Sequence, residues 1–370
     1  PFLAIGGILA QRGHHITCLF PEQFRESTNQ EGFDFESLGP EFLEILDSPI
    51  GQAALGGSAK GLSKVKSYIQ LAGKFRKINQ AMVIKQRQVI ENLLPDVIVH
   101  NGKVIFPVIW NAMNKGKSIL VSPVPYLHYV KGHAHLAFNS NFGSILNKFT
   151  FWIARFGLTQ TIMSSLKSLD LKNLVRRKKV IEIQKRGHTL YTISPSLFPR
   201  SNDWHENIKV VGYHDRPSEK SFQPTEDLIQ FLEQHDKILF ITFGSMTNPS
   251  PREKTQAFID VLTQQKIPAI FNIASGGLQA PERFNEKQFF FINGIPYDYI
   301  FSKVYAVIHH GGSGTTHMGL KYQLPTMIIP HIIDQFVWNK MIRDLGVGPL
   351  GCDISQVKVS KLAPRIHDLW

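Results

Sequence analysis

The sequence predicts an α/β fold with two domains built on parallel sheets, and three observations support this. Short β-branched and aromatic runs alternate with helical patterns along the second half of the chain, as βαβ units require. One such run, Val304–Ile308, leads directly into a glycine-rich turn and then a helical pattern. The chain has 370 residues, 43% of them hydrophobic, which exceeds one typical domain and suffices for two cores.

The first domain is predicted over residues 1–215. A helix is expected at its start, because Pro1 suits the first helical position and apolar residues follow at helical spacing as far as Gly13. A basic, mostly helical region, Lys60–Leu94, follows the second predicted strand. Six short apolar runs bounded by Gly, Pro or polar residues are expected to be strands: Ile16–Phe20, Phe33–Leu38, Val97–Val99, Ser118–Ser122, Thr189–Ile193 and Ile208–Val211.

A segment rich in aromatic and histidine residues follows the strand that ends at Ser122 and reaches Trp152. We expect a long loop here and interpret it as one side of an acceptor-binding site. Tyr126, His128 and Tyr129 are expected to contact the acceptor. No metal site is predicted, since no Cys or carboxylate joins the loop histidines. The apolar residues at the end of the segment are expected to cover a pocket or core: Phe149, Trp152, Ile153, Phe156 and Leu158.

The second domain is predicted over residues 237–370. Residues 216–236 are the best linker candidate, because the segment from Tyr213 to Pro224 is polar and contains prolines. The domain then alternates strands with helices, of which Arg252–Gln265 is the clearest. Its expected strands are Ile238–Phe243, Ala269–Ile273, Phe289–Ile292, Val304–Ile308 and Thr326–Ile329.

The glycine-rich turn carries the strongest chemical signal in the chain. After His309 and His310 come Gly311-Gly312-Ser313-Gly314-Thr315-Thr316, which open a helix. Glycines let the backbone approach a ligand, and a helix start offers N–H groups and a positive dipole end, so the turn suits a phosphate group. The alternative is a ligand-free turn of the kind found in many α/β proteins. ATP and NAD are disfavoured, because neither the P-loop nor the Rossmann glycine order is present.

These residues, followed by Asp334-Gln335, an Asn and a final Gly-x-Gly, resemble the donor signature of the UDP-glycosyltransferase superfamily, and most of all its sterol and lipid glucosyltransferases. The resemblance implies the GT-B fold, in which two Rossmann-like domains face each other across a cleft. It also implies a metal-independent, inverting transfer of a hexose, glucose by the resemblance, from a UDP-sugar to a hydroxyl of a hydrophobic acceptor such as a sterol or lipid. The UDP-sugar is a co-substrate, and no cofactor is expected.

The resemblance also implies roles for individual residues. Asp334 and Gln335 would bind the hexose hydroxyls, Ser245 would touch the donor phosphate, and the main chain around Ile295 would pair with uracil. His100 resembles a turn of the lipid enzymes and is assigned to the acceptor, with a structural hinge as the alternative. The sequence departs from the family pattern at two positions that would contact the nucleoside. Gly294 replaces a stacking Trp of plant members, and His317 replaces a ribose-binding Glu. The donor diphosphate is assigned to the turn: His309, Gly311, Gly312, Ser313, Gly314 and Thr315.

In the resembling family the catalytic base lies on a turn before the first helix. Since the chain begins at Pro1, we expect that base upstream, and the last helix of the family to be incomplete after Trp370. The catalytic residue is therefore not assigned. An inactive UDP-sugar-binding or membrane-associated fragment is the alternative function.

The net charge of +12 is concentrated in two stretches. Lys60–Ile90 carries +8 and Lys167–Arg186 carries +6, so the rest of the chain sums to −2. The stretches predict peripheral contact with an anionic membrane, with a solvated helix face as the alternative. Nucleic-acid binding is not expected, because no recognised module is present. With only Cys18 and Cys352 and no apolar run of membrane length, we expect a cytoplasmic protein, peripheral at the membrane.

Overall fold

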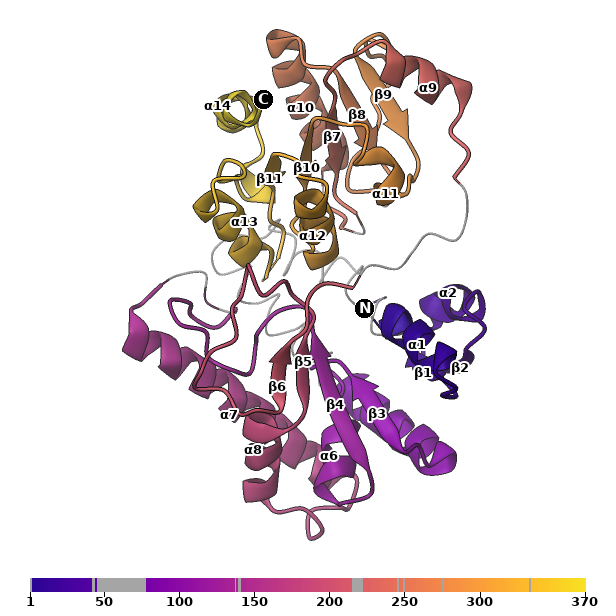
Figure 1. Cartoon of the computed structure of the whole chain (residues 1–370), viewed down its shortest axis with the longest axis vertical. Coiled ribbons are helices and arrows are strands. Elements are labelled where there is room, and N and C mark those ends of the chain that lie inside the picture. The colour runs from indigo at the N-terminus through magenta and orange to yellow at the C-terminus, as the bar shows by residue number, and fades with distance from the viewer. Residues whose placement is uncertain are drawn as a thin grey trace. The chain divides into compact units, whose positions relative to one another are not determined.

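The computed structural model describes residues 2–41, 44, 78–136, 138, 141–214, 222–244, 246–248, 250–274, 276–332 and 334–370. These residues form two compact units, one ending at residue 214 and the other beginning at residue 222. Each unit is built around parallel strands (Figure 1).

Unit 1 contains two parallel sheets. Strands β1 and β2 pair alone, and the larger sheet has the order β3-β4-β5-β6. Residues 78–93 are also helical. The elements are α1 (Phe2–Gln11), β1 (Thr17–Phe20), η1 (Glu22–Phe24), α2 (Arg25–Asn29), β2 (Asp34–Ser37), β3 (Val97–His100), α6 (Phe106–Ala112), β4 (Lys117–Ser122), α7 (Ser144–Ser168), α8 (Arg177–Arg186), β5 (Thr189–Tyr191) and β6 (Ile208–Val210).

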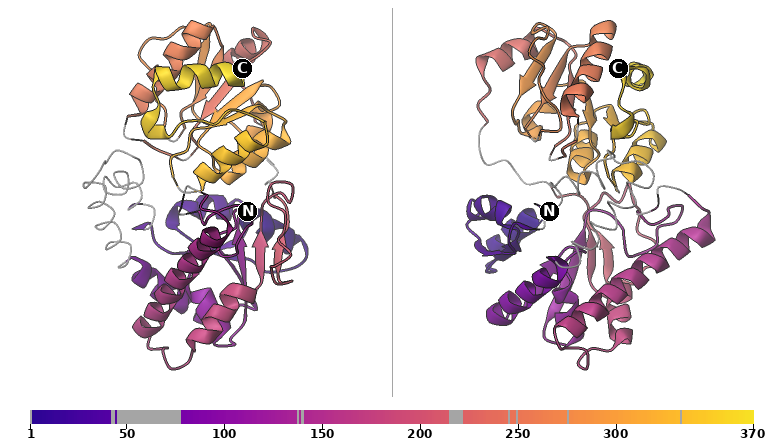
Figure 2. Two further views of the ribbon diagram at one scale, coloured as in Figure 1. Left: turned by 90° about the vertical axis from the view of Figure 1, so that its left-hand side faces the viewer. Right: turned by 180° about the vertical axis from the view of Figure 1, so that it is seen from behind.

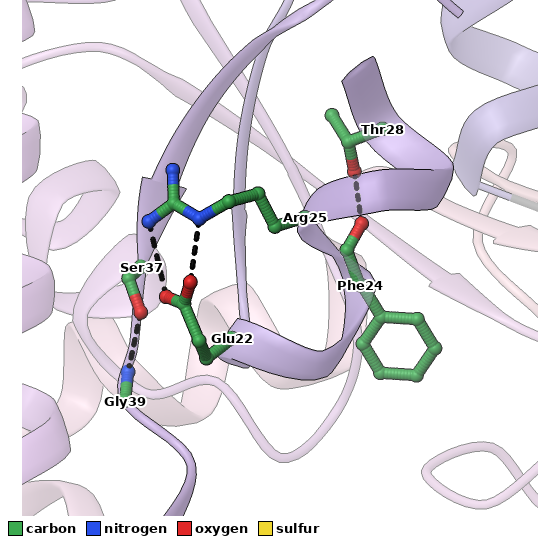
Figure 3. Close-up of polar contacts among 6 residues, drawn as sticks. All are labelled: Glu22, Phe24, Arg25, Thr28, Ser37 and Gly39. Carbon is green, nitrogen blue, oxygen red and sulfur yellow. Dashed lines mark hydrogen bonds and ion pairs between the residues drawn. The ribbon is translucent and has the colours of Figure 1, made fainter. Parts of the chain in front are cut away.

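A local polar cluster connects η1 to strand β2 of the small sheet (Figure 3). Arg25 donates from Nε and Nη2 to the two carboxylate oxygens of Glu22, the second bond at 3.1 Å. Hydrogen bonds to Arg25 and Ser37 lower the pKa of Glu22 to about 2. Ser37 Oγ also accepts from the N–H of Gly39 at 3.0 Å, which fixes the turn that leaves β2.

Helix α6 anchors the core of unit 1 and begins with a filled cap. Phe106 and Ile109 are completely buried, in one cluster with Ile162 and Leu166 of α7. The start of α6 is also buried, so its first N–H groups need a partner. The side-chain oxygen of Gln86 supplies it, accepting from the N–H groups of Ile105 at 3.3 Å and of Phe106 at 3.0 Å.

Unit 2 contains one five-stranded parallel sheet with the order β11-β10-β7-β8-β9. Helices α10 and α14 lie side by side in this unit (Figure 2). The elements are α9 (Glu226–Glu233), β7 (Leu239–Thr242), α10 (Pro251–Gln265), β8 (Ala269–Asn272), β9 (Phe289–Ile292), α11 (Tyr297–Ile300), β10 (Ala306–His309), α12 (Ser313–Lys321), β11 (Thr326–Ile328), α13 (Gln335–Asp344), η2 (Ile354–Gln356) and α14 (Val359–Leu369).

The central strands of unit 2 are buried along their whole length. Every residue of β7, β8 and β10 is buried, as expected for parallel strands that are covered on both faces. This explains why these runs read as continuous apolar segments rather than as alternating ones. The buried sheet holds the loops at its carboxyl edge in fixed positions.

Most predicted elements are found, and the strands agree within two residues at each end. One prediction is wrong: the expected loop as far as Trp152 is helical from Ser144, because α7 begins there. Phe149, Trp152, Ile153 and Phe156 lie on its exposed side and do not cover a core.

The predicted domain limits stay a prediction. Helix α9 lies within the expected linker, where Thr225 Oγ1 caps it by accepting from the N–H of Leu228 at 3.3 Å. The basic region Lys60–Leu94 lies outside the described residues as far as residue 77.

Candidate functional site

The sheet order of unit 2 defines where a ligand is expected. The chain passes from β7 outward through β8 to β9, and then crosses to β10 and β11 on the other side of β7. The direction of the strand order therefore reverses between the neighbouring strands β7 and β10. Thr242 of β7 pairs with His309 of β10 at their carboxyl ends. In open parallel sheets, ligands bind outside the carboxyl ends of the strands at such a switch point.

Helix α12 starts at this point without a side-chain cap. Its N-cap residue is Gly312, which has no side chain to offer, and the carbonyl of Gly312 accepts from the N–H of Thr316 at 2.9 Å. A helix leaves its first N–H groups without intrahelical partners, and here these belong to Ser313, Gly314 and Thr315. The dipole adds a partial positive charge at the same place. The arrangement suits an anion.

The turn before α12 tolerates only glycine at two positions. Gly311 has φ +92°, and a Cβ there would lie 2.6 Å from Cγ2 of Ile328. A Cβ at Gly312 would collide with the ring of His310. The glycines of the motif therefore serve close packing of the turn against β11 and His310.

His309 shapes the turn from inside the protein. Its side chain is fully buried, and Nδ1 accepts from the N–H of Gly311 at 3.0 Å, so the ring proton sits on Nε2. Burial, reinforced by His310, holds the pKa of His309 well below its ordinary value, and the ring is neutral. Within the described residues Nε2 has no hydrogen-bond partner. Direct contact of His309 with a diphosphate stays a prediction.

His310 links the two loops of the switch point, and the sequence analysis did not assign it a role. Its ring packs against Gly312 after β10, and a Cβ at Gly244 after β7 would lie 2.7 Å from its Cε1. Burial, with His331 nearby, lowers the pKa of His310 to about 4. The only signal in the sequence was the doubled histidine at the end of a buried strand.

A hydroxyl cluster that the sequence analysis also missed ties β7 to α11 and α12. Oγ1 of Thr242 lies 3.2 Å from the hydroxyl of Tyr297. The same Oγ1 accepts a hydrogen bond from Asn272 Nδ2 at 3.4 Å. The Tyr297 hydroxyl also hydrogen-bonds the side chain of Thr315. Burial raises the pKa of Tyr297, so it stays protonated. The cluster positions Thr315 in the first turn of α12.

Asn272 also holds the segment predicted to pair with uracil. Its Oδ1 accepts from the N–H of Gly294 at 3.1 Å and from that of Ala274 at 3.2 Å. Ile295 is buried, and Gly294 has φ +92°. The main chain of this segment is therefore held at the carboxyl edge, beside the loops that follow β7 and β8.

The predicted sugar-binding pair occupies the start of α13. Asp334 is the N-cap residue and is partly exposed. Gln335 is buried, and its Oε1 accepts from the N–H groups of His331 at 2.7 Å and Ile332 at 3.0 Å. The oxygen of Gln335 thus fixes the preceding loop, and its amide N–H group is what remains for a sugar hydroxyl.

The four predicted acceptor residues divide between two cavities of unit 1. His100 and Tyr126 line a mostly apolar cavity of about 30 Å³, which has room for about one water molecule. His128 and Tyr129 line a separate cavity of about 500 Å³. His128 bonds the Tyr191 hydroxyl through Nδ1 at 2.7 Å, and burial lowers its pKa to about 4. The two pairs thus line different cavities, and their contact with an acceptor stays a prediction.

Ser245 lies outside the described residues, so its role toward the donor stays a prediction. Among the residues that the structure describes, no three His, Cys, Asp or Glu side chains come together as a metal-binding group. No described helix combines the length and the apolar character that crossing a membrane requires.

Comparisons with known proteins agree with this geometry. The family described as "Erythromycin biosynthesis protein CIII-like, C-terminal domain" matches residues 289–367, which contain α12 and α13. The sterol 3-beta-glucosyltransferase UGT80A2 of Arabidopsis thaliana is 32% identical over 231 residues, which cover 58% of this chain and 36% of that protein. UGT80B1, a sterol 3-beta-glucosyltransferase of the same plant, is 28% identical over 397 residues, which cover 99% of this chain and 60% of that protein.

Among solved structures, the spinosyn rhamnosyltransferase SpnG complexed with thymidine diphosphate aligns with a TM-score of 0.64 and 13% identity, covering 99% of this chain and 86% of that one. The fold is thus that of the GT-B glycosyltransferases, which confirms the predicted fold class. Within this class, the chain resembles the UDP-glycosyltransferases and in particular the sterol 3-beta-glucosyltransferases, so the predicted resemblance is confirmed. The chain spans 36% and 60% of the length of the two plant relatives.

Proposed function

We propose that the protein transfers glucose from UDP-glucose to the hydroxyl of a sterol or similar lipid, with inversion at the sugar carbon. The observation that carries this proposal is the uncapped start of α12 at the β7–β10 switch point, which suits a diphosphate. The similarity to sterol 3-beta-glucosyltransferases supports the sterol acceptor and the glucose donor.

The reaction needs a stabilised leaving group. The acceptor oxygen forms a bond to the anomeric carbon, the bond from that carbon to the diphosphate breaks, and UDP leaves with the electron pair. The acceptor proton passes to a base. We assign the growing charge on the diphosphate to the N–H groups of Gly314 and Thr315 and the hydroxyl of Ser313, in the first turn of α12. Donors fixed before the reaction lower its barrier, because they need no reorganisation.

The donor is positioned by three parts of the carboxyl edge. The diphosphate lies at α12, the hexose hydroxyls meet Asp334 and the amide N–H of Gln335, and the uracil pairs with the main chain around Ile295. A nucleoside diphosphate is supported as the ligand class by SpnG, a protein of the same fold that is complexed with thymidine diphosphate.

A UDP-sugar-binding protein without transfer is the second candidate. It rests on the same site, because an uncapped helix start binds a diphosphate whether or not a base is present. The two functions therefore differ in turnover and agree in donor binding.

We also propose a cytoplasmic location with peripheral membrane contact. Both cysteines, Cys18 and Cys352, are free and buried, which supports a reducing compartment. A sterol acceptor resides in membranes, and the basic stretch Lys167–Arg186 favours an anionic surface. Fractionation of cells that express a tagged protein tests this: recovery in the lumen of an oxidising compartment would contradict it.

Calorimetry with UDP, thymidine diphosphate and UDP-glucose, followed by an acceptor screen with radiolabelled UDP-glucose, tests the proposal. We expect binding of UDP-glucose and label transfer to sterols in vesicles. Binding without transfer to any acceptor would favour the second candidate. Absence of nucleotide binding would exclude both.

A further inference from the structure

The outer face of α7 is apolar where solvent would favour polar residues. We define this face as Ile145, Leu146, Phe149, Trp152, Ile153 and Phe156. All six are exposed, including Ile145 at 82% and Trp152 at 51%. They recur at helical spacing on the side of α7 opposite Phe151 and Ile162, which are buried in unit 1. The helix is therefore apolar on two opposite sides.

Single exposed apolar residues are ordinary on protein surfaces, but this cluster is continuous. The rings of Phe149 and Trp152 stack at 5.4 Å, and those of Trp152 and Phe156 at 5.5 Å. A ladder of three aromatic rings along about two turns presents one wide apolar surface. Such surfaces mark sites of contact with a protein or a membrane.

Basic side chains border the outer face of α7. Helix α8 packs beside α7 (Figure 1) and carries five Lys or Arg residues and one Glu in its sequence RKKVIEIQKR. Arg177 places its guanidinium 5.3 Å from the centre of the Phe156 ring and donates to Oε1 of Gln160 at 3.1 Å. Aromatic side chains next to long basic ones are typical of helices that lie in a membrane interface.

A basic cavity opens beside the same helix. The cavity of about 500 Å³ that contains His128 is lined by Lys148 and Arg155 of α7, Lys185 and Arg186 of α8, and a single carboxylate, Asp203. His128, which lines the cavity, is 5% exposed and bonds the Tyr191 hydroxyl. Four cations against one carboxylate suit a phosphate group.

We propose that the outer face of α7 enters the interface of an anionic bilayer while the basic cavity receives the phosphate of a lipid headgroup. Lys148 lies directly before Phe149 in the sequence and lines the cavity, so one helix joins the apolar and the charged contact. The charge of α8 favours a negatively charged surface over a second copy of this basic chain. This inference rests on the membrane contact in the proposed function, and names the surface that makes it.

Vesicle sedimentation tests the proposal with matched variants. Phe149→Ser combined with Trp152→Ser is expected to weaken binding to vesicles of phosphatidylserine and phosphatidylcholine by roughly tenfold or more, because two aromatic side chains no longer leave water. Leu345→Ser, which alters an exposed leucine of unit 2, should leave binding unchanged. Lys185→Glu with Arg186→Glu should weaken binding to the anionic vesicles and leave the weak binding to pure phosphatidylcholine unchanged.

Fluorescence locates the contact directly. Brominated lipid should quench the emission of the bound wild type, and Trp152→Phe should lose most of this quenching while it keeps vesicle affinity. Vesicle affinity that is unchanged in the Phe149 and Trp152 double variant would overturn the proposal, as would a dimer in sedimentation velocity that this variant abolishes without any effect on vesicles.

UDP calorimetry on the same variants keeps the two proposals separable. Unchanged UDP affinity in a variant that has lost vesicle binding supports the membrane face and shows that unit 2 is intact, while an unchanged circular dichroism spectrum and unfolding transition show that unit 1 is folded. If UDP fails to bind the wild type while the vesicle results hold, the donor proposal fails and the membrane face stands.

Discussion

Two helix starts, one in each unit, solve the same problem in opposite ways. Helices α6 and α12 both follow the carboxyl end of a parallel strand that ends in a buried histidine, His100 or His309. At α6 the oxygen of Gln86 accepts from the first N–H groups. At α12 the N-cap is a glycine, and the first N–H groups are left for another partner. The comparison shows that the uncapped start at the β7–β10 switch point is the one to which we assign the diphosphate, whereas the capped start of α6 is closed to a ligand.

The largest expected effect is at the open start. Ser313→Asp places a carboxylate where the diphosphate is assigned, so UDP affinity should fall at least about 100-fold, or ~2.7 kcal/mol. The variant should not lose thermal stability, because a carboxylate at a helix start interacts favourably with the dipole. Calorimetry and thermal unfolding measure the two effects.

Ser144→Asp is the matched control, since Ser144 also begins a helix behind a glycine N-cap. It should leave UDP affinity as in the wild type. Equal UDP affinity in the Ser313 variant would remove α12 from the phosphate site.

Within unit 2, the assignment of Asp334 to the hexose can be tested separately from the assignment of α12 to the diphosphate. Asp334→Ala should weaken UDP-glucose by about 1.5 to 3 kcal/mol, the usual effect of losing hydrogen bonds to a charged group, and leave UDP nearly unaffected. Competition calorimetry with both ligands measures this difference. Asp344→Ala, at the exposed other end of α13, serves as the control. Equal losses for both ligands would move Asp334 out of the sugar site.

The capped start of α6 predicts an effect on stability and none on UDP binding. Gln86→Leu leaves the N–H groups of Ile105 and Phe106 buried without an acceptor, which should cost about 1 to 3 kcal/mol of unfolding free energy. UDP affinity should not change. Chemical denaturation measures the loss, and Gln88→Leu at an exposed position of the same helical segment controls for the substitution. A stable Gln86 variant would mean that α6 needs no cap.

Buried histidines should also give the stability of both units a pH dependence. His100, His128, His310 and His331 have pKa values of about 4 against an ordinary value of 6.5, chiefly through burial. The unfolded chain therefore takes up protons first as pH falls, so the destabilisation by these four histidines should be absent above pH 6.5, grow toward pH 4 and level off below it. Each histidine contributes at most about 1.4 kcal/mol per pH unit in this window.

Denaturation curves recorded across this range measure the slope. His310→Gln should reduce it, whereas a change at the exposed His14 should not. A flat profile in the wild type would show that these rings are not neutral by burial.

The sequence revealed the strands and the turn of unit 2 because both depend on local patterns. Apolar runs mark the buried strands, and the glycines with Ser313 and Thr315 mark the helix start. The hydroxyl cluster of Thr242, Asn272 and Tyr297 was not visible, because its members are distant in sequence and meet only through the sheet order. Gln86 was missed for the same reason.

Helix α7 shows a different limit. Its apolar residues occupy two opposite sides, so the periodicity that would identify an amphipathic helix is weakened, and aromatic and histidine residues suggested a loop. The pattern also could not tell which side is covered. That distinction depends on where α8 and α6 pack against the helix.

The strand order of unit 2 also bears on how the protein is made. Strand β7 sits at the centre of its sheet, yet its partner β10 is translated only after β8 and β9. While the nascent chain is short, one edge of a mostly apolar strand, which is buried along its whole length in the folded protein, therefore remains unpaired, and such edges invite association with other chains. We expect the ribosome-bound intermediate that ends between β9 and β10 to be the stage of synthesis at which this protein most needs a chaperone.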